Sequence, residues 1–243
     1  MKLISARSGN HNTVSINLPY YRQRLVLSDY VLRYLFDNPN YFLEANKCAS
    51  ISEFADRVKE YFFRRAIRDG LCMLQNMPDR NDSVMEIGGG IGASLALFIQ
   101  NMRSVDRIIF VEQETRTIRG NQWCMRKLAQ QFLERNGIPR DRYIFLPASK
   151  HEIHNIMSAS ISMVVSFRAL GYQFPVDFYA SEISRLLKSS GVLILDISKA
   201  RQNSSGEFRK NMFTIEKMFQ NVSIIEETHA RLRLKACNPV ATL

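Results

Sequence analysis

The residues best suited to chemistry are a run of glycines that follows a short apolar segment and a carboxylate. The run reads Glu86-Ile87-Gly88-Gly89-Gly90-Ile91-Gly92, and a further acid, Glu112, lies 20 residues beyond Gly92. Glycine adopts positive φ angles and lets the backbone approach a ligand closely. A helix that begins directly after such a loop presents free backbone N–H groups to that ligand. The pattern predicts a nucleotide-type cofactor site in which Glu112 accepts hydrogen bonds from ribose hydroxyls.

Two cofactors compete for this site. Gly88, Gly90 and Ala93 also satisfy the GxGxxG/A pattern of proteins that bind nicotinamide dinucleotides. A dinucleotide would bring its pyrophosphate close to the carboxylate of Glu86, and like charges at that distance repel each other. S-adenosylmethionine carries an ammonium and a sulfonium group and no phosphate, so a carboxylate before the loop favours it. The extra Gly92 favours S-adenosylmethionine as well.

The elements that must hold this loop alternate between strands and helices after residue 82. Short apolar runs predict strands at 83–87, 107–112, 143–146, 161–166 and 191–197, and a final antiparallel pair at 222–226 and 230–235. Helical spacing predicts helices at 93–102, 115–136, 175–188 and 207–220. The alternation predicts an α/β fold with a Rossmann-like, seven-stranded, mostly parallel sheet and an antiparallel C-terminal strand.

The N-terminal third has a different texture and predicts an N-terminal helical cap. Residues 1–22 are polar and mixed, and we expect an irregular arm there. Apolar residues recur at three- and four-residue steps over 23–77, which predicts helices with a break at Asn38-Pro39-Asn40. We therefore expect two parts, an arm and helical cap at 1–80 and a cofactor-binding domain at 81–243.

At the glycine loop the sequence resembles the class I S-adenosylmethionine-dependent methyltransferases. Glu86–Gly92 resembles their first motif, ExGxGxG, and Glu112 matches their acidic second motif. The segment 187–196 is similar to their later L-x-x-G-G-x-L motif, with Ser190 in place of the first glycine. The resemblance implies that Gly88, Gly89, Gly90 and Gly92 wrap S-adenosylmethionine and that Glu86 lies near its amino-acid end. Family members often carry an acid for the adenine after the third strand, whereas this chain offers Ser149 there. Ser166, at the end of the fourth strand, completes the candidate cofactor-binding set.

The loop after the fourth strand lies where such a domain binds its methyl acceptor. Residues 166–175 resemble a G-Y-H-[FY]-P segment of bacterial sugar O-methyltransferases, and residues 38–42 resemble the same group. Gln173 replaces the histidine of that pattern, and glutamine cannot take the proton of a sugar hydroxyl. The candidate bases are Asp177, His151 and His154, unless positioning of the substrates alone supplies much of the rate. Arg168 and Tyr172 are the candidates for orienting a polar acceptor. His151 and His154 have no obvious third ligand, so we expect no metal.

Composition and charge set the remaining expectations. The 243 residues are 46% hydrophobic and include 15 Phe and 9 Tyr, enough to bury a core. No apolar run is long enough to span a bilayer. The four cysteines show no CxxC spacing, so we expect neither zinc nor disulfides and expect a cytoplasmic protein. The net charge of +10 falls mainly outside residues 81–196, where it is only +2.

These observations leave four hypotheses open. The first is a methyltransferase that O-methylates a sugar or another small polar metabolite. The second is an RNA methyltransferase, which the positive charge favours. The third is a non-catalytic binding module that keeps the methyltransferase fold, and the fourth is a nicotinamide-dependent oxidoreductase, which Glu86 disfavours. Neither the acceptor nor the oligomeric state can be determined from the sequence.

Overall fold

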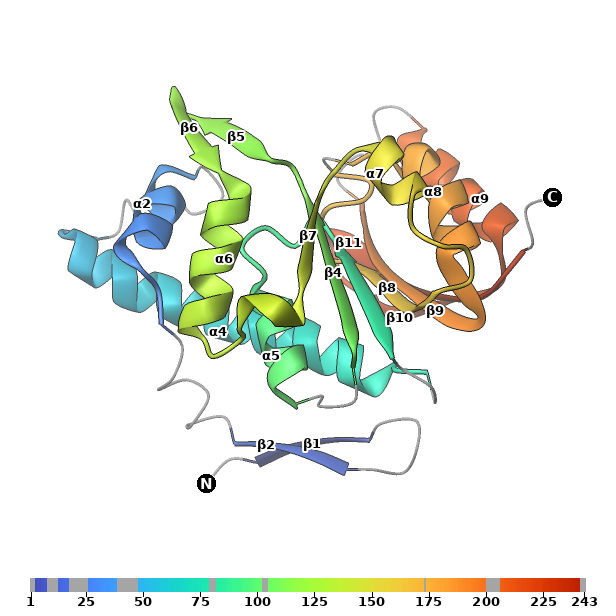
Figure 1. The fold of residues 1–243 in the computed structure, drawn as a ribbon, viewed down its shortest axis with the longest axis horizontal. Coiled ribbons are helices and arrows are strands. Elements are labelled where there is room, and N and C mark those ends of the chain that lie inside the picture. The colour runs from blue at the N-terminus through green and yellow to red at the C-terminus, as the bar shows by residue number, and fades with distance from the viewer. Residues whose placement is uncertain are drawn as a thin grey trace. The chain divides into compact units, whose positions relative to one another are not determined.

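The computed structural model describes residues 3–7, 13–17, 26–38, 48–78, 82–101, 105–172, 174–199 and 206–240. These residues divide into two compact units. One contains 1–75, 90–103 and 113–142, and the other contains 76–89, 104–112 and 143–243. Both are drawn in Figure 1, and each is described by itself below.

The second unit contains a seven-stranded sheet in the order β10-β11-β9-β8-β3-β4-β7. The strands are β3 (Ser83–Ile87), β4 (Arg107–Glu112), β7 (Ile144–Pro147), β8 (Ile161–Ser166), β9 (Leu187–Ser198), β10 (Phe219–Glu227) and β11 (Arg231–Pro239). The pairs from β7 to β9 are parallel, whereas β11 pairs antiparallel with β9 and with β10. This sheet confirms the predicted α/β fold, its mostly parallel pairing and its antiparallel C-terminal end.

Burial explains why these strands form. Every residue of β3 and β8 is buried, as expected for central parallel strands covered on both faces. Three helices accompany the sheet in this unit: α7 (Lys150–His154), α8 (Val176–Leu186) and α9 (Glu207–Met218). Figure 1 shows them side by side, and their buried residues join those of β8, β9 and β11 in one apolar core.

The first unit is mainly helical. It contains α2 (Asp29–Asp37), α4 (Ile51–Gln75), α5 (Ala93–Asn101), α6 (Met125–Arg135) and the short 3₁₀ helix η2 (Arg140–Arg142). Ser28 caps α2 by accepting a hydrogen bond from the Val31 N–H. Helices α4 and α5 approach closely at Gly70, where a Cβ atom would come within 2.6 Å of Leu97 Cδ2. The helices of the predicted N-terminal cap are therefore confirmed where the chain is described.

Two hairpins in the first unit correct the sequence-based predictions. Residues 3–7 and 13–17 are not part of an irregular arm, because β1 (Leu3–Arg7) pairs antiparallel with β2 (Thr13–Asn17). The helix predicted over 115–136 is wrong in its first ten residues. These form β5 (Thr115–Ile118) and β6 (Asn121–Cys124), and α6 begins only at Met125. Arg119 and Gly120 both have positive φ angles, the geometry of a tight two-residue hairpin turn.

Candidate active site

The candidate cofactor residues gather where the parallel strands end. Strand register places Ile87 beside Val111 and Glu112 beside Pro147, so β3, β4 and β7 end at one edge of the sheet. Strand β8 runs parallel to β3 on the other side and ends at the same edge. The carboxyl edge of such a sheet, at the switch in strand order, is where α/β proteins bind ligands.

The first residue of the glycine loop is fixed by packing. Gly88 has a φ of +72°, and its N–H donates to the Val111 carbonyl at 2.8 Å. A Cβ atom here would lie 2.1 Å from Ala169 Cβ and 3.0 Å from the Phe174 ring. Gly88 therefore joins β3 to the loop after β8, and a side chain is excluded by both contact and backbone conformation.

Glu86 and the next glycine form a second close contact. The Glu86 side chain is fully buried, and a Cβ atom at Gly89 would lie 2.6 Å from its Oε2 atom and 2.7 Å from the Phe110 ring. The missing side chain at Gly89 thus makes room for the carboxylate beneath the loop. An ionised carboxylate at this position would repel a pyrophosphate and attract a cationic group.

The last two glycines of the loop have left-handed backbone conformations. Gly90 and Gly92 have φ angles of +67° and +81°. A Cβ atom at Gly90 would meet no heavy atom of the described chain within 4 Å. Helix α5 begins at Ala93, directly after the loop. The space beside the Gly90 Cα atom is thus open, and a ligand could approach the chain there.

The other three cofactor candidates have different surroundings. Glu112 is 6% exposed and ends β4. Ser149 precedes α7 and caps it, since its Oγ accepts from the Glu152 N–H. Ser166 is fully buried, donates to the Ile87 carbonyl at 3.0 Å and accepts from the Leu170 N–H at 3.0 Å. Its hydroxyl bonds both β3 and the loop after β8. We therefore propose that Ser166 holds this loop in position next to the site.

A tyrosine outside the predicted set lies near Glu112. Tyr179 in α8 donates a hydrogen bond to the Ala148 carbonyl at 3.4 Å. Burial, together with the negative charge of Glu112, raises its pKa to about 12. The phenol is therefore protonated at neutral pH and serves as a hydrogen-bond donor beside the carboxyl end of β7.

The loop after β8 has a defined backbone conformation. Its N–H groups at Gly171 and Phe174 donate to the Phe174 and Ala169 carbonyls at 2.7 and 3.0 Å. Arg168 has a left-handed φ of +60°, which is uncommon for a residue with a side chain and is often found at functional sites. Gln173, at the position of the expected histidine, lies outside the described residues.

Tyr172 links this loop to a buried charge cluster. Burial raises its pKa, and the negative charge of Asp196 raises it further, against the opposing effect of Arg168. Its side chain also hydrogen-bonds Ser198 at the end of β9. Tyr172 is thus a neutral, positioned phenol at neutral pH.

The charge cluster was not predicted from the sequence. Asp196 is fully buried and accepts from Arg231 Nη1 at 2.5 Å and from Arg233 Nε at 2.7 Å. Arg233 is 1% exposed, and its guanidinium lies 4.5 Å from the centre of the Phe167 ring. The available signal was the alternation Arg231-Leu232-Arg233-Leu234, which places both arginines on one face of a strand. These ion pairs stabilise the C-terminal end of β9, where Ser198 lies.

Two of the candidate bases, Asp177 and His154, do not converge on this loop. Asp177 is exposed and pairs with Lys210 Nζ at 2.7 Å, and that hydrogen bond lowers the pKa of the carboxyl. His154 Nδ1 lies 3.2 Å from Glu182 Oε1 in the last turns of α8. That end of α8 bonds the residues just before β8, at the opposite edge of the sheet from the glycine loop. His151 belongs to α7, but its side chain lies outside the described part of the chain.

Among the described residues, no group of three or more His, Cys, Asp or Glu side chains is placed to hold a metal ion. None of the described helices combines the length and apolar character needed to cross a membrane.

Solved structures with a similar fold include methyltransferases. A proposed S-adenosyl-L-methionine-dependent methyltransferase from Methanococcus maripaludis matches with a TM-score of 0.56 at 14% identity, over 78% of this chain and 92% of that one. A proposed O-methyltransferase from Klebsiella pneumoniae matches with a TM-score of 0.54 at 13% identity, over 90% and 95%. The chain has a methyltransferase-like Rossmann fold. At these identities the likeness shows the fold alone.

Spermidine synthases share part of this fold. One in complex with the transition-state analogue AdoDATO matches with a TM-score of 0.50 at 17% identity, over 65% of this chain. The chain spans about half the length of the two spermidine synthases it matches, 54% and 55%. No protein-family model matches the sequence, and no curated protein sequence matches it significantly.

Proposed function

We propose that this protein is an S-adenosylmethionine-dependent methyltransferase that O-methylates a sugar or another small polar metabolite. The observation that carries the proposal is the glycine loop with a fully buried carboxylate beneath it. Glu86 lies against Gly89, while the position of a Cβ atom at Gly90 faces open space. This arrangement suits a cationic cofactor better than a dinucleotide.

The residues at the sheet edge fit S-adenosylmethionine. We assign Gly88, Gly89, Gly90 and Gly92 to the wall that wraps the cofactor, and Glu86 to its amino-acid end. We assign Glu112 to the ribose, whose hydroxyls would donate hydrogen bonds to its carboxylate. When bound, the cofactor supplies an electrophilic methyl group. Tyr179 and Ser149 offer hydroxyl groups near the ends of β4 and β7, in the position where family members carry an acid for the adenine.

On the acceptor side, we propose that positioning contributes more than proton removal. Asp177 is exposed and paired with Lys210, and its lowered pKa makes it a weak base. His154 lies toward the far edge of the sheet. Arg168 and Tyr172 remain as the groups that orient a polar acceptor, with Tyr172 donating a hydrogen bond. Correct placement of two reactants alone supplies a large part of many rate enhancements.

RNA is the second candidate acceptor, and the net charge of +10 favours it. The basic cluster at residues 64–68 gives less support, because Arg64 pairs with Glu60 and both Arg65 and Arg68 pair with Asp69. The test is transfer of a labelled methyl group from S-adenosylmethionine to a panel of sugars, nucleotide sugars and RNA. Label on a sugar supports the first proposal, label on RNA replaces it with the second, and label on neither contradicts both.

A further inference from the structure

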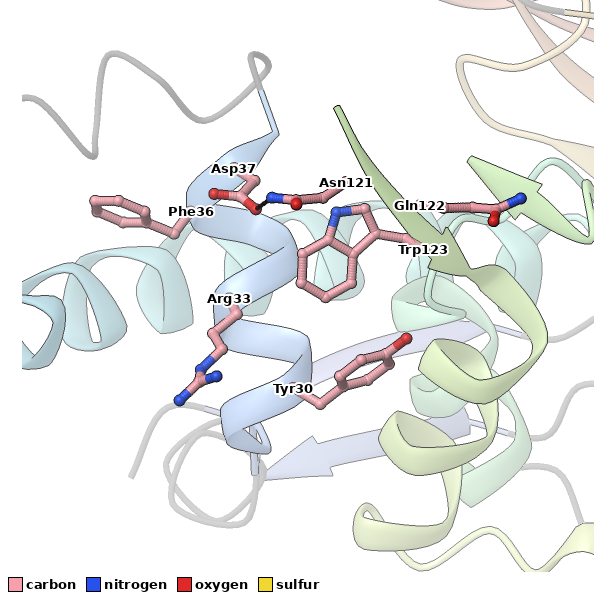
Figure 2. Close-up of a pocket in the computed structure, with 7 residues that line it drawn as sticks. All are labelled: Tyr30, Arg33, Phe36, Asp37, Asn121, Gln122 and Trp123. Atoms are coloured by element: carbon pink, nitrogen blue, oxygen red, sulfur yellow. Dashed lines mark hydrogen bonds between the residues drawn. The ribbon is translucent and has the colours of Figure 1, made fainter. Parts of the chain in front are cut away.

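A pocket of about 450 Å³ lies in the first unit, apart from the residues assigned to the cofactor. It is formed by α2 and the strand β6 of the β5–β6 hairpin (Figure 2). Its lining consists of three aromatic residues, one arginine, one acid and two amides: Tyr30, Arg33, Phe36, Asp37, Asn121, Gln122 and Trp123. The volume falls within the range of small-ligand sites.

The pocket contains a buried hydrogen-bond donor without a partner. Trp123 is 8% exposed, and its Nε1 atom is buried with no hydrogen-bond partner among the described atoms. In Figure 2 the edge of the indole that carries Nε1 points toward the polar end of the pocket, where Asp37 and Asn121 lie. Buried donors are almost always paired in folded proteins, because an unmade bond is costly. A ligand with an acceptor atom would satisfy this one.

Asp37 provides the acceptor at the same end of the pocket. It is the last residue of α2, where a negative charge opposes the helix dipole, and the last turn contains no basic residue to offset it. Asn121 Nδ2 donates to Asp37 Oδ2 at 3.1 Å. A carboxylate accepts about four hydrogen bonds, so this contact leaves Asp37 able to accept others. The acid is therefore better explained by a ligand than by helix stability.

The remaining lining residues are planar or cationic. Tyr30 packs against Trp123, with ring centroids 5.2 Å apart, and Lys127 Nζ lies 4.9 Å from the centre of the Tyr30 ring. Arg33 also lines the pocket. Aromatic rings and guanidinium planes stack on bases, and Asp, Asn and Gln read base edges. Arg33 and Lys127 could also contact a phosphate.

We propose that this pocket binds a nucleobase, presented either by a free nucleotide or by single-stranded RNA. Trp123 Nε1 donates to a ring nitrogen or carbonyl of the base, and Asp37 accepts from an amino or ring N–H group. Tyr30 and Arg33 provide planar surfaces for the ring. A sugar fits less well, because sugars stack on a broadly exposed aromatic face and Trp123 offers mainly an edge. The proposal goes beyond methyl transfer and does not depend on it.

Trp123 is the single tryptophan of the chain, so its fluorescence reports on this pocket alone. The experiment titrates the full chain with AMP, GMP, CMP and UMP, and with ribose 5-phosphate and glucose, while following tryptophan emission and the indole ¹⁵N–¹H resonance. We expect a saturable change with at least one nucleotide and none with the two compounds that lack a base. No response to any nucleotide, or an equal response to ribose 5-phosphate or glucose, overturns the proposal.

Matched variants locate the response. Asp37→Ala should weaken nucleotide binding about tenfold or more, since it removes a hydrogen bond to a charged group. Asp141→Ala, an exposed acid in η2, removes the same charge and should change binding less than twofold. Equal effects of the two variants overturn the proposal. Gly90→Asn tests independence from the cofactor loop, because loss of the nucleotide response in that variant would place the nucleotide there instead.

A short single-stranded RNA separates the two sources of the base. Binding that is at least tenfold tighter than the mononucleotide, and that weakens steeply with salt, assigns the pocket to RNA. Equal affinity assigns it to free nucleotides. Both results support a nucleobase site, provided that Asp37→Ala weakens them.

Discussion

Gly90 allows the cofactor proposal to be tested without unfolding the protein. Its φ is +67°, and a Cβ atom there would meet no described atom within 4 Å. Asparagine tolerates this left-handed conformation better than most residues. Gly90→Asn should therefore cost about 1 kcal/mol of stability, while its side chain fills the space that we assign to the cofactor. Gly137 provides a matched control, with a φ of +80° and equally open surroundings.

The assay is isothermal titration calorimetry with S-adenosylhomocysteine, after thermal melts of both variants. The melts should fall by a similar few degrees, because both changes impose the same backbone strain. Gly90→Asn should weaken binding about 100-fold, or about 2.7 kcal/mol, whereas Gly137→Asn should bind like the wild type. The reasoning is refuted if folded Gly90→Asn binds within threefold of the wild type, or if Gly137→Asn loses as much affinity.

Three further predictions concern the framework of the site. Gly88→Ala should lower the free energy of unfolding, measured with denaturant, by about 3 kcal/mol, because it adds backbone strain and overpacking. Adding Ala169→Gly should recover about 1 kcal/mol of that loss by removing the 2.1 Å contact. If the double variant shows no recovery, the contact between these positions is contradicted. Asp196→Ala should cost about 3 kcal/mol, because it removes the fully buried carboxylate that pairs with Arg231 and Arg233 and leaves the partly exposed Glu226 to pair with both; a loss below 1 kcal/mol would argue against the cluster. Hydrogen bonds from Lys188 hold the pKa of Asp82 well below its usual value, so the stability from this pair is present above about pH 4 and is lost as the pH falls further. Between pH 5 and pH 2.5 the wild type should lose about 1 kcal/mol more than Asp82→Asn, a modest figure because the pair is partly exposed, and parallel losses would contradict this.

The strands of the central sheet were predictable because their apolar runs are short, buried and bounded by turns. The predictions for 83–87, 107–112 and 161–166 agree with β3, β4 and β8 to the residue. The β1–β2 hairpin was missed because residues 1–22 are polar and mixed overall, although Thr13–Asn17 does alternate polar and apolar side chains. The β5–β6 hairpin was missed because Thr115–Cys124 was merged with the helical pattern that follows it, although Arg119-Gly120 was a usable turn signal.

In the candidate site, features within one short segment could be predicted from the sequence, whereas contacts between distant segments could not. The glycine loop and Glu112 could be found because their spacing is contained in one strand–loop–helix–strand segment. The cluster of Asp196 with Arg231 and Arg233 depends on which strands pair, which the local sequence does not determine. The pocket around Trp123 joins segments about 90 residues apart. Sequence reasoning therefore located the glycine loop but neither the charge cluster nor the pocket.

The most direct test of the central claim is calorimetry of the wild-type protein with S-adenosylmethionine, S-adenosylhomocysteine and NAD. The buried carboxylate of Glu86 beneath the glycine loop predicts binding of both sulfur compounds. The same charge predicts no binding of NAD, since the pyrophosphate would lie beside it. Binding of NAD alone, or of none of the three, would contradict the assignment of this loop to S-adenosylmethionine.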